Sequence, residues 1–570
     1  MKKMLATVAA LCMTVQLYVP VSAADEVTIY VSPVGRADAS GDKNNPVGSI
    51  DDAERLLEKY SGKNVKILFH AGKYDLSDTL TLDSKDSVTF AAYGDGDVIF
   101  SGAKTLKNSG FSAVKDPDIL DRLTRSARSS VLEYHLSDSG VEYSKNDAVR
   151  PYLFVDDVMK TAARYPNGEY LTATAANGTK SFSYDGYDIS KWESADDAVL
   201  VGSADSTYFW RNYDISVLGN VITASGNVRK GAKFYVENLL EELDTPGEYF
   251  IDRDENILYY YPDSEIENEK IEVISFLNDA VKLKSSTNIT FDGITFDKIG
   301  GRAIQATGAE NVVIKNCNFD YVQGESVISL TGKESCISDN SFYGCANTAV
   351  TFHGGSIRTL TNGNIAVKNN RISFCGYKSK NAIISSGSSA TSIPSDFGNS
   401  VTNNIIQDCM TFMGISINAN DYEINYNEII NQGYLIGDGG AIYMGRSNVK
   451  YGTEVAYNYI HDGHKNDPAY AYCGLYSDDG YSGTNFHHNV VKDMYQGVIA
   501  GIGMNCRINN NLFINNSNAS AIGSRMTNYS KDGGAVESGM QDTMYNELDT
   551  ILKRTDYGEL FKTHYPEIAT

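Results

Sequence analysis

The residues best suited to chemistry gather in two short glycine-rich stretches in the last third of the chain. One is "GLYSDDG", in which Asp478 and Asp479 stand side by side, and the other is "IGDGGAIYMGR", in which Asp438 stands among glycines. Adjacent carboxylates disfavour joint ionisation, so one of them keeps its proton to a higher pH than usual. Such a pair can supply a proton donor and a base, which makes Asp478 and Asp479 candidates for catalysis. The glycines around Asp438 would let another group approach its carboxylate closely.

Aromatic and basic residues stand close to these carboxylates in the sequence. Tyrosine combines an apolar ring with a polar hydroxyl and suits the faces and hydroxyl groups of sugars. A longer loop sequence, "YIHDGHKNDPAYAY", separates the two stretches and adds histidine and aspartate. The residues expected to bind substrate are Tyr443, Arg446, His461, Asp462, Tyr476 and Arg525.

The same residues also fit a purely structural interpretation. Asp-Gly pairs are frequent in turns, so "DDG" and the pair His461 and Asp462 are also typical of turn and packing residues. Arg446 would then do no more than neutralise Asp479. We prefer the functional interpretation because three carboxylates, an arginine and two histidines fall within two successive repeats.

A short phrase repeats along the C-terminal half and predicts how these residues are positioned. Copies such as "ISDNSF", "VKNNRI" and "INYNEI" end on an apolar residue, and the shortest separation between copies is 22 residues. A minimum unit of this size, lengthened irregularly by insertions, indicates a right-handed parallel β-helix, whose coils each contain three short strands. The aligned apolar residues are Phe296, Phe319, Phe342, Ile372, Ile406, Ile429, Ile460, Val491 and Phe513.

Two further columns of residues support this alignment. Three cysteines, Cys345, Cys375 and Cys409, follow the aligned position and are expected to form a stack of buried thiols, with a metal or redox role as the weaker alternative. An asparagine precedes the aligned residue by two positions in seven coils, and stacked coils would let these side chains bond to one another. The asparagines are Asn340, Asn370, Asn404, Asn427, Asn458, Asn489 and Asn511.

The alignment also sets the register of the strands that carry the carboxylates. Ile442 and Leu475 occupy the same position in neighbouring coils, so Gly445 should lie beside Asp478. One position further on, the same register pairs Arg446 with Asp479.

Other parts of the chain read as separate segments. The helix predicted around "SIDDAERLLEKY" has Ser49 or Asp51 as its N-cap and would cover the open end of the β-helix. The repeat is lost over a stretch that holds both tryptophans, which predicts an inserted β-rich domain. The expected segments are a signal peptide (1–23), an N-terminal cap with the first coils (24–110), the inserted domain (111–270), the main β-helix (271–530) and a partly helical C-terminal segment (531–570).

Composition narrows the function classes. A basic start, an apolar run and a small-residue cleavage pattern predict export of a protein without a membrane span. The net charge of −23 disfavours nucleic acid, and also polyanionic glycans such as pectate or alginate. Removal of residues 1–23 leaves seven of the eight cysteines, and an odd number argues against a fully paired disulfide framework. We expect a monomer that uses no cofactor and no metal.

The quoted stretches also carry a resemblance to a known family. "DGGAIYMGR" and "GLYSDDG", with "LFVDDVMKTAARYPN" and "GEYFIDRDENILYYYPD" in the interruption, resemble glycoside hydrolase family 141 and its relatives. The resemblance covers most of the mature chain, although the final coils look shorter. It implies a secreted β-helix enzyme acting on plant glycans, in the range of fucosidases and xylanases, with an acid/base pair at Asp438 and one of Asp478 and Asp479. We take Asp479 as that residue.

Geometry raises a difficulty for this pair. Asp438 precedes Ile442 by four positions and Asp479 follows Leu475 by four, so a straight path would separate them by roughly 26 Å. Cleavage of a glycosidic bond needs two carboxyl groups roughly 5 to 10 Å apart. Either a corner in the chain brings them together, or Asp479 has another partner, for which Asp462 is next in line.

Two other functions fit the same fold. A polysaccharide lyase or epimerase would use an arginine or lysine base, here Arg446 or Arg525, usually with Ca²⁺. A non-catalytic protein that binds glycans at a surface would use the tyrosine-lined face alone. The expected partner in each case is a polysaccharide or oligosaccharide from plant or host.

Overall fold

The computed structural model describes most of the chain between residues 26 and 535. The described residues are 26–147, 149–174, 177–184, 186, 188–192, 195–203, 211–378, 381–387, 396–433, 439–445, 449–463, 472–478, 480–500, 504–522, 530–531 and 534–535. The predicted signal peptide and the predicted C-terminal helix lie outside these residues. No helix among the described residues is long and apolar enough to cross a membrane.

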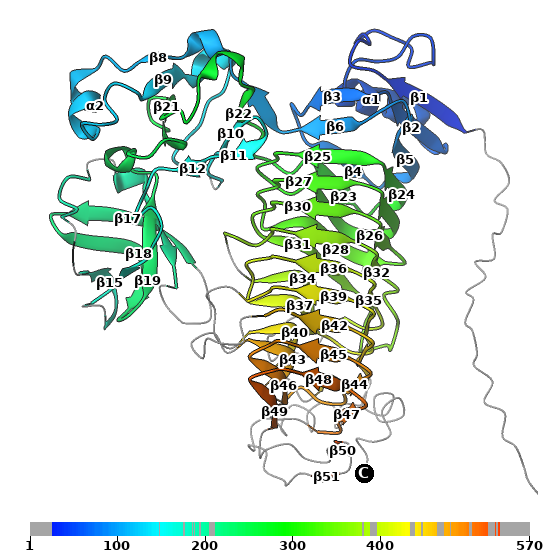
Figure 1. Cartoon of the computed structure of the whole chain (residues 1–570). Coiled ribbons are helices and arrows are strands. Elements are labelled where there is room, and N and C mark those ends of the chain that lie inside the picture. The colour runs from blue at the N-terminus through cyan, green and yellow to red at the C-terminus, as the bar shows by residue number, and fades with distance from the viewer. Residues whose placement is uncertain are drawn as a thin grey trace, which may run out of the picture.

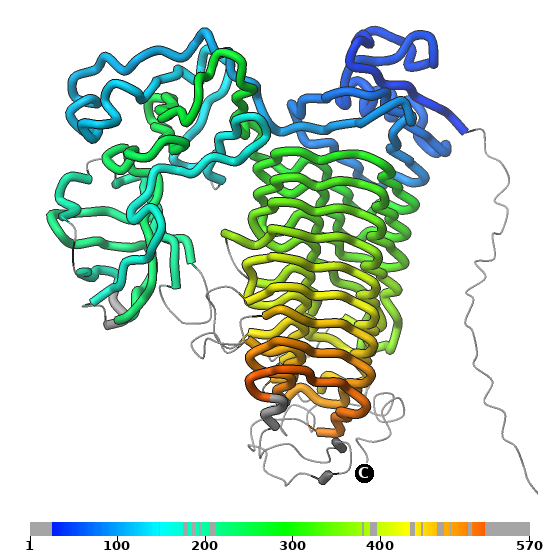
Figure 2. Tube along the Cα trace, in the orientation of Figure 1, coloured from blue at the N-terminus to red at the C-terminus, as the bar shows by residue number. Residues whose placement is uncertain are grey.

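The main body is a parallel β-helix whose coils stack along one axis (Figures 1 and 2). One wall, here called the repeat sheet, is built from the strands that end each repeated phrase. All its strand pairs are parallel. Its strands are β3 (Gly72–Asp75), β6 (Val98–Ser101), β25 (Ile294–Asp297), β27 (Asn318–Asp320), β30 (Ser341–Tyr343), β33 (Arg371–Ser373), β36 (Ile405–Gln407), β39 (Glu428–Ile430), β42 (Tyr459–His461), β45 (Val490–Lys492) and β48 (Leu512–Ile514).

The second wall follows the repeat sheet along the chain and is here called the second sheet. Its strands are β4 (Leu80–Asp83), β23 (Val281–Lys284), the first part of β26 (Ile304–Lys315), β28 (Ser326–Lys333), β31 (Thr348–Gly354), β34 (Ala382–Gly387), β37 (Met413–Asn418), β40 (Gly440–Gly445), β43 (Cys473–Asp478), β46 (Gln496–Ala500) and β49 (Asn518–Ile522). Ile442 pairs with Leu475 and Gly445 with Asp478, which confirms the predicted register.

The third wall completes each coil and is continuous with the second sheet through β26. Its strands are β1 (Val27–Val31), β2 (Val65–Phe69), β5 (Asp86–Ala92), β24 (Thr287–Asp292), the last part of β26, β29 (Cys336–Ser338), β32 (Ala366–Lys368), β35 (Ser400–Thr402), β38 (Glu423–Asn425), β41 (Glu454–Ala456), β44 (Asn485–His487), β47 (Arg507–Asn509) and β50 (Ser530–Lys531). The short β51 (Gly534–Ala535) pairs with β50 in the antiparallel sense.

The core lies inside the coils, where alternate strand residues point inward. The aligned apolar residues of the repeat pair with one another coil by coil, as predicted, and eight of the nine are fully buried or nearly so. The rings of Phe296 and Phe319 stack at 5.2 Å, and those of Phe319 and Phe342 at 4.8 Å. Close-packed rings of this kind stabilise the interior of successive coils.

The predicted asparagine ladder forms at the corner between the third wall and the repeat sheet. From β29 onward two residues separate the strands at this corner in each coil, and the second of them is the asparagine. Asn427 shows the pattern, because its side-chain oxygen accepts from the backbone and side-chain N–H of Asn404 at 3.0 Å, and its own amide donates to Asn458 at 3.0 Å. The first corner residue adopts a left-handed conformation, for example Asn403 (φ +56°), which asparagine tolerates well.

The predicted thiol stack also forms. Cys345, Cys375 and Cys409 are fully buried, unbonded cysteines in three consecutive coils. Burial holds the pKa of the Cys375 and Cys409 thiols well above the usual range, so both stay protonated and unreactive.

A short helix covers the N-terminal end of the β-helix, as predicted. The helix α1 (Ile50–Leu57) is capped by Ser49, whose hydroxyl accepts from the backbone N–H of Asp52 at 3.1 Å. Its apolar face, which includes Leu56 and Leu57, is buried against the first coils. This helix removes an exposed sheet end that would otherwise invite self-association.

The coils are interrupted between β6 and β23 by a separate β-rich domain, which stands beside the β-helix in Figures 1 and 2. It contains four-, five- and seven-stranded sheets and its own buried clusters, with Trp192 in one of them. Its elements are β7 (Ala103–Thr105), β8 (Ser112–Ala113), α2 (Pro117–Arg122), β9 (Leu132–His135), β10 (Leu153–Val155), β11 (Val158–Met159), β12 (Thr161–Ala162), β13 (Arg164–Tyr165), β14 (Leu171–Thr172), β15 (Asn177–Phe182), β16 (Val199–Gly202), β17 (Arg211–Leu218), β18 (Val221–Arg229), β19 (Lys233–Glu237), β20 (Glu248–Asp252), β21 (Ile257–Tyr260) and β22 (Ile271–Ile274).

A charged cluster joins the root of this domain to the coils. Glu272 on β22 is 1% exposed and lies within 3.2 Å of three lysines, Lys73, Lys270 and Lys298. Burial raises the pKa of Glu272, but the lysine charges outweigh burial, so its pKa lies below the usual value. The ionised Glu272 therefore connects β22 to two separate coils.

Candidate functional site

The structure describes five of the nine residues predicted for the site. Tyr443, Tyr476, Asp478, His461 and Asp462 are described. Asp438, Arg446, Asp479 and Arg525 lie outside the described residues. The predicted pair of Asp438 with Asp479 and the predicted contact of Asp479 with Arg446 therefore stay predictions.

Asp478 ends β43 on the outer side of the second sheet. Its carboxylate accepts a hydrogen bond from the Tyr443 hydroxyl on the neighbouring strand β40, at 2.8 Å. Gly445 lies beside Asp478 and makes this bond possible, because a Cβ on Gly445 would stand 2.6 Å from the Tyr443 hydroxyl oxygen. The sequence "YMG" followed one coil later by "YSDD" thus builds a carboxylate with a fixed donor.

A buried lysine supports the strand that carries this donor. Lys450 is fully buried, and its ammonium donates to the carbonyl oxygen of Gly445 at 3.1 Å. On the other side, the backbone N–H of Gly445 donates to the side-chain oxygen of Asn418 at 2.9 Å. Gly445 is therefore held from both neighbouring directions, which fixes the backbone next to Asp478.

Aromatic rings cover the wall around Asp478. Tyr443 and Tyr476 meet edge to face at 5.3 Å, and Phe412 lies 6.2 Å from Tyr443. Tyr443 is 8% and Tyr476 is 6% exposed although both stand on the outer side of the sheet. The equivalent residues of earlier coils, Ser329 and Thr351, are more exposed. Along this column the outer residue changes from the half-buried Ser329 and Thr351 to the buried Ser416 and then to the covered tyrosines beside Asp478.

Asp478 also belongs to a row of outer positions that runs along the second sheet. Hydrogen bonds and strand pairs link Gly387 to Asn418, Asn418 to Gly445, and Gly445 to Asp478. His353 stands one strand before Gly387. Strands are about 4.8 Å apart, so the row from His353 to Asp478 is about 19 Å long.

A second charged pair marks the far end of this row. The Nδ1 of His353 lies 2.8 Å from a carboxylate oxygen of Asp396, which is 2% exposed. The hydrogen bond to Asp396 raises the pKa of His353, and burial opposes this effect. The imidazolium form of His353 is therefore more favoured than in a free histidine, and the row has the His353–Asp396 pair at one end and the Asp478 carboxylate at the other.

His461 and Asp462 lie on a different wall. His461 ends β42 in the repeat sheet, with its ring nitrogens 2.7 Å from Asp462 and 3.2 Å from Glu428. Asp462 has a φ of +58° and repeats the left-handed turn position that Asp408 and Asn431 hold in earlier coils. Among the described residues, no hydrogen bond or ion pair connects them to Asp478. The contacts of His461 and Asp462 are therefore those expected if both are turn and packing residues.

Sequence reasoning missed Asn418, Lys450, His353 and Asp396. The register would have shown Asn418 and His353, because both fall in the same outer row as Asp478 when the coils are stacked. Lys450 and Asp396 follow irregular turns whose path has no repeat to align, so the sequence carried no signal for their positions. The described residues contain no group of three or more histidine, cysteine or acidic side chains that would hold a metal ion.

Comparison with known proteins confirms the fold. The family model described as "Right handed beta helix region" matches residues 256–450, which agrees with the predicted hand and repeat. No curated protein matches the chain. A solved structure named "Glycoside hydrolase" has a TM-score of 0.54 at 13% identity and covers 91% of this chain and 98% of its own. Because 91% of this chain is covered, the match includes at least part of the inserted domain.

Two other solved structures show a weaker likeness. XylC in complex with xylose has a TM-score of 0.48 at 10% identity, covering 90% of this chain and 86% of its own. The family 28 exopolygalacturonase of Yersinia enterocolitica has a TM-score of 0.41 at 9% identity, covering 90% and 79%. At these identities the likeness shows the fold alone. The chain has a right-handed parallel β-helix, and the resemblance to glycoside hydrolase family 141 stays a prediction.

Proposed function

We propose that this protein is a secreted glycoside hydrolase that binds a plant or host glycan on the outer wall of its second sheet. The observation that carries the proposal is the Asp478 carboxylate, fixed by the Tyr443 hydroxyl at 2.8 Å on a wall lined by Tyr476. A positioned carboxylate beside tyrosine rings is the equipment that sugar recognition and acid/base chemistry need. The shared fold with a structure named as a glycoside hydrolase supports the same reaction class.

The hydrogen bond from Tyr443 also suggests how the carboxylates divide the work. A donor to a carboxylate favours its ionised form, so Asp478 carries a negative charge. We assign the ionised form to Asp478 and the protonated form to Asp479, because adjacent carboxylates disfavour joint ionisation. In this proposal Asp479 donates the proton to the leaving oxygen, and Asp438 attacks the sugar or activates water. Arg446, Arg525, His461 and Asp462 remain proposed contacts to substrate.

The experiment is a glycan panel combined with single carboxamide variants. The panel contains aryl α-fucosides, aryl β-xylosides, xylan and pectin side chains, with product analysis by chromatography. We expect Asp438→Asn and Asp479→Asn to lower kcat by about 10³-fold or more on a substrate that the natural chain hydrolyses, because each removes an essential proton transfer or a nucleophile. Asp478→Asn should mainly change the pH dependence of hydrolysis.

The matched control is Asp83→Asn. Asp83 ends β4 and occupies the same outer row as Asp478 at the opposite end of the second sheet. Its loss should leave kcat unchanged. Full activity of Asp479→Asn would refute the catalytic role of Asp479. Unsaturated products that absorb ultraviolet light would show that the reaction is that of a lyase and not hydrolysis. Glycan binding without turnover, unaffected by all three substitutions, would identify a binding protein instead.

A further inference from the structure

Three aromatic side chains are stacked on the outside of the coils. Tyr426, Tyr457 and His488, here called the aromatic stack, hold the corner position just before the asparagine ladder in three consecutive coils. The rings of Tyr426 and Tyr457 are parallel within 6° with their centres 5.0 Å apart, and the ring of His488 follows that of Tyr457 at 5.1 Å. The stack therefore runs along the axis of the β-helix at the spacing of the coils.

The backbone at this corner is an unusual place for a tyrosine. Tyr426 and Tyr457 have φ values of +60° and +58°, in the left-handed region that asparagine and aspartate tolerate much better. The amide of Asn369, at the same corner of an earlier coil, donates to the Asp339 carboxylate at 3.2 Å, so polar residues link successive coils here without a bulky side chain. Other coils have asparagine or aspartate at this position, namely Asn316, Asp339, Asn369, Asn403 and Asn510.

Burial does not account for the tyrosines either. Tyr426 is 56% and Tyr457 is 45% exposed, so neither ring fills the core. The coil before Tyr426 has Asn403 at this corner, and its short side chain leaves the outer face of the Tyr426 ring open. Bulky residues that adopt a strained conformation and stay exposed are typical of binding surfaces.

Hydrogen-bonding groups are fixed beside the stack. The Nε2 of His487 lies 2.8 Å from a carboxylate oxygen of Glu454, and its Nδ1 lies 2.9 Å from the Nδ1 of His488. The His487 ring also meets the Tyr457 ring edge to face at 5.7 Å. The Glu454 side chain is 42% exposed, so its carboxylate can accept further hydrogen bonds from outside. Ring faces and an oriented acceptor thus share one surface.

The aromatic stack lies on the side of the coils opposite Asp478. Each coil passes from the repeat sheet to the second sheet and then to the third wall, so the corner between the third wall and the repeat sheet faces away from the second sheet. In Figure 1, β35 and β44 of the third wall lie on the right, whereas β40 and β43 lie on the left, toward the inserted domain. A ligand on the stack is therefore not the sugar unit held at Asp478.

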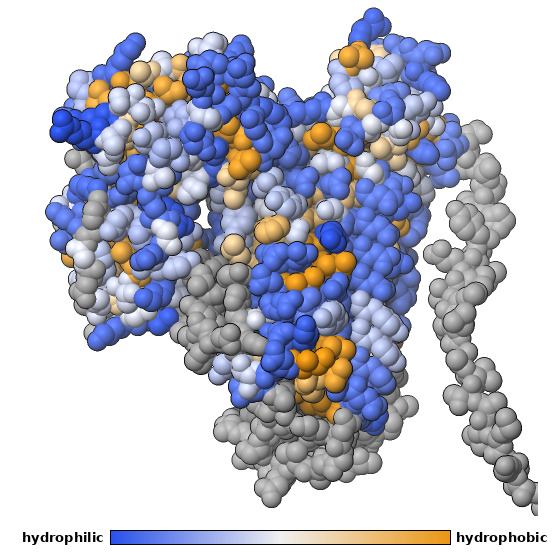
Figure 3. Space-filling view, viewed as in Figure 1, coloured by the Kyte–Doolittle hydropathy of each residue, from blue (hydrophilic) through white to orange (hydrophobic). Residues whose placement is uncertain are grey.

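The surface next to the stack is also apolar. Figure 3 shows an apolar area over β45 and β48, the strands that follow this corner in the last coils. It includes Leu512, which is 54% exposed, and Ile514, which is 36% exposed. An extended ligand along the stack would therefore meet further apolar contacts on the repeat sheet.

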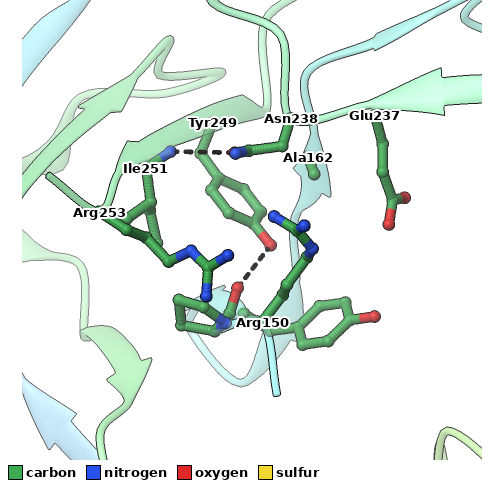
Figure 4. A pocket seen from close by; sticks show the side chains of 9 residues that line it. Arg150, Ala162, Glu237, Asn238, Tyr249, Ile251 and Arg253 are labelled. Carbon is green, nitrogen blue, oxygen red and sulfur yellow. Dashed lines mark hydrogen bonds between the residues drawn. The ribbon is translucent and has the colours of Figure 1, made fainter. Parts of the chain in front are cut away.

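Charge and space narrow the kind of ligand. The net charge of −23 and the carboxylate of Glu454 disfavour a polyanion, and the same charge opposes a second copy of the chain. The cavity in Figure 4 has a volume of about 20 Å³, room for a single water, so a sugar would not enter the inserted domain there. A neutral glycan fits the stack, because sugar rings can lie on Tyr426 while their hydroxyls donate to Glu454.

We propose that the aromatic stack is a second glycan-binding site, which holds a neutral polysaccharide chain on the side of the coils away from Asp478. The inference rests on the proposed function, because the bound polymer would be the one that is cleaved on the second sheet. The stack supplies no group to bond cleavage. It raises the effective concentration of the polymer around the enzyme between cleavage events.

The test is affinity electrophoresis of the whole protein in native gels that contain xylan or xyloglucan. We expect at least one polysaccharide to retard the natural chain, and the double variant Tyr426→Asn, Tyr457→Asn to bind it about tenfold or more weakly, because two ring contacts are lost. The Tm of the double variant should stay the same or rise, because asparagine suits the left-handed conformation. Tyr426→Phe keeps the ring and should keep most of the affinity. Added salt should have little effect on binding of a neutral ligand.

Phe374→Asn is the matched control. Phe374 is also an exposed ring in the left-handed region, with a φ of +55° and 49% exposure, but it follows β33 at the other corner of the repeat sheet. Its loss should leave the affinity unchanged.

Three results would decide against parts of this account. No retardation of the natural chain, or equal retardation of the natural chain and the double variant, would overturn the second site. A dimer in solution that the double variant dissociates would assign the stack to self-association instead. Retardation that depends on Tyr426, in a chain that cleaves no glycan, would refute the proposed function and keep the second site.

Discussion

At the scale of single residues, the bond from Tyr443 to Asp478 is the feature most open to direct measurement. Tyr443→Phe removes the hydroxyl and leaves the ring that packs on Tyr476. The lost donor had favoured the ionised carboxylate, so the lower apparent pKa of the Asp478 and Asp479 pair should rise. We expect the acid limb of the kcat/KM profile to move to higher pH by about one unit.

The pH profile of Tyr459→Phe provides the comparison. Tyr459 is an exposed tyrosine of the repeat sheet that stacks on His461 at 4.0 Å. Its hydroxyl should have no part in the titration, and the profile should match that of the natural chain. An unshifted acid limb in Tyr443→Phe would mean that Asp478 does not titrate in the reaction.

Asp320 gives a second residue-scale prediction, which concerns stability. Burial, together with the charge of the neighbouring Asp297, raises the pKa of Asp320 to about 6. The folded state therefore binds this proton more tightly than the unfolded state, and stability falls as pH rises from about 4 to above 6. Asp320→Asn should raise the free energy of unfolding by about 1–2 kcal/mol at pH 8 and have little effect at pH 4.

Urea unfolding at both pH values measures this effect, with Asp38→Asn at an exposed position as the control. The same gain at pH 4 and pH 8 would show that the carboxylate is not the cause. Asp320 lies in β27, so the measurement also reports on a wall remote from the proposed site.

The residue-scale predictions from sequence worked where the repeat fixed the register. The contact between the coils of Tyr443 and Asp478 follows from the alignment of Ile442 with Leu475, which the structure confirms. The pairing of charges in turns did not follow, because turn residues have no partner position in the next coil. Lys450 is the clearest case, since a fully buried lysine under Gly445 leaves no periodic trace.

At the scale of elements, the asparagine ladder should be the most sensitive part of the coils. Asn427→Leu would leave the backbone N–H of Asn404 without this acceptor and its side-chain amide with the Val367 carbonyl alone, and it would remove the donor to the Val401 carbonyl. Unsatisfied buried groups cost about 1–3 kcal/mol each. We expect a loss of about 2–4 kcal/mol in the free energy of unfolding, measured by urea denaturation.

The comparison variant is Asn318→Ala on the exposed side of β27. Its amide makes one bond, to the Thr295 hydroxyl at 3.2 Å, and is not part of the ladder. Its loss should change stability by no more than about 0.5 kcal/mol. Equal effects of the two substitutions would contradict a special role for the ladder.

Elements were predictable in proportion to their regularity. The strands of the repeat sheet follow from a phrase that recurs in every coil, and α1 follows from a cap and an apolar face. The strand β34 is harder to recognise, because in "AIISSG" Ser386 stands where the neighbouring strands have Phe352 and Ile417. The structure shows that this segment is a strand of the second sheet, because it pairs with β31 and β37.

At the scale of the whole molecule, Glu272 should decide how firmly the inserted domain is attached. Glu272→Gln leaves Lys73, Lys270 and Lys298 clustered without their shared anion. Breaking a buried ion pair by removing one partner is strongly destabilising, by about 3 kcal/mol or more. We expect faster hydrogen exchange in β7 and β22, measured by mass spectrometry, with little change in the coils after β31.

Glu267→Gln is the control for this experiment, because Glu267 is an exposed carboxylate close by in the chain. Uniform faster exchange throughout the coils would show that the cluster stabilises the whole fold. The interruption between coils could be predicted from the loss of the repeat. Its three sheets could not be predicted, because the pairing of their strands leaves no repeating pattern in the sequence.

The fixed two-residue corner that carries the asparagine ladder has a consequence for evolution. From β26 to β48 every coil keeps the same length there, while the turns on either side of the second sheet differ from coil to coil. Selection can therefore lengthen, shorten or exchange those turns without shifting the alignment of one coil on the next. A laboratory library confined to exposed positions of such a turn, for example Arg358, Thr359, Thr361 and Asn362 between β31 and β32, would sample new specificities on a scaffold whose architecture stays intact.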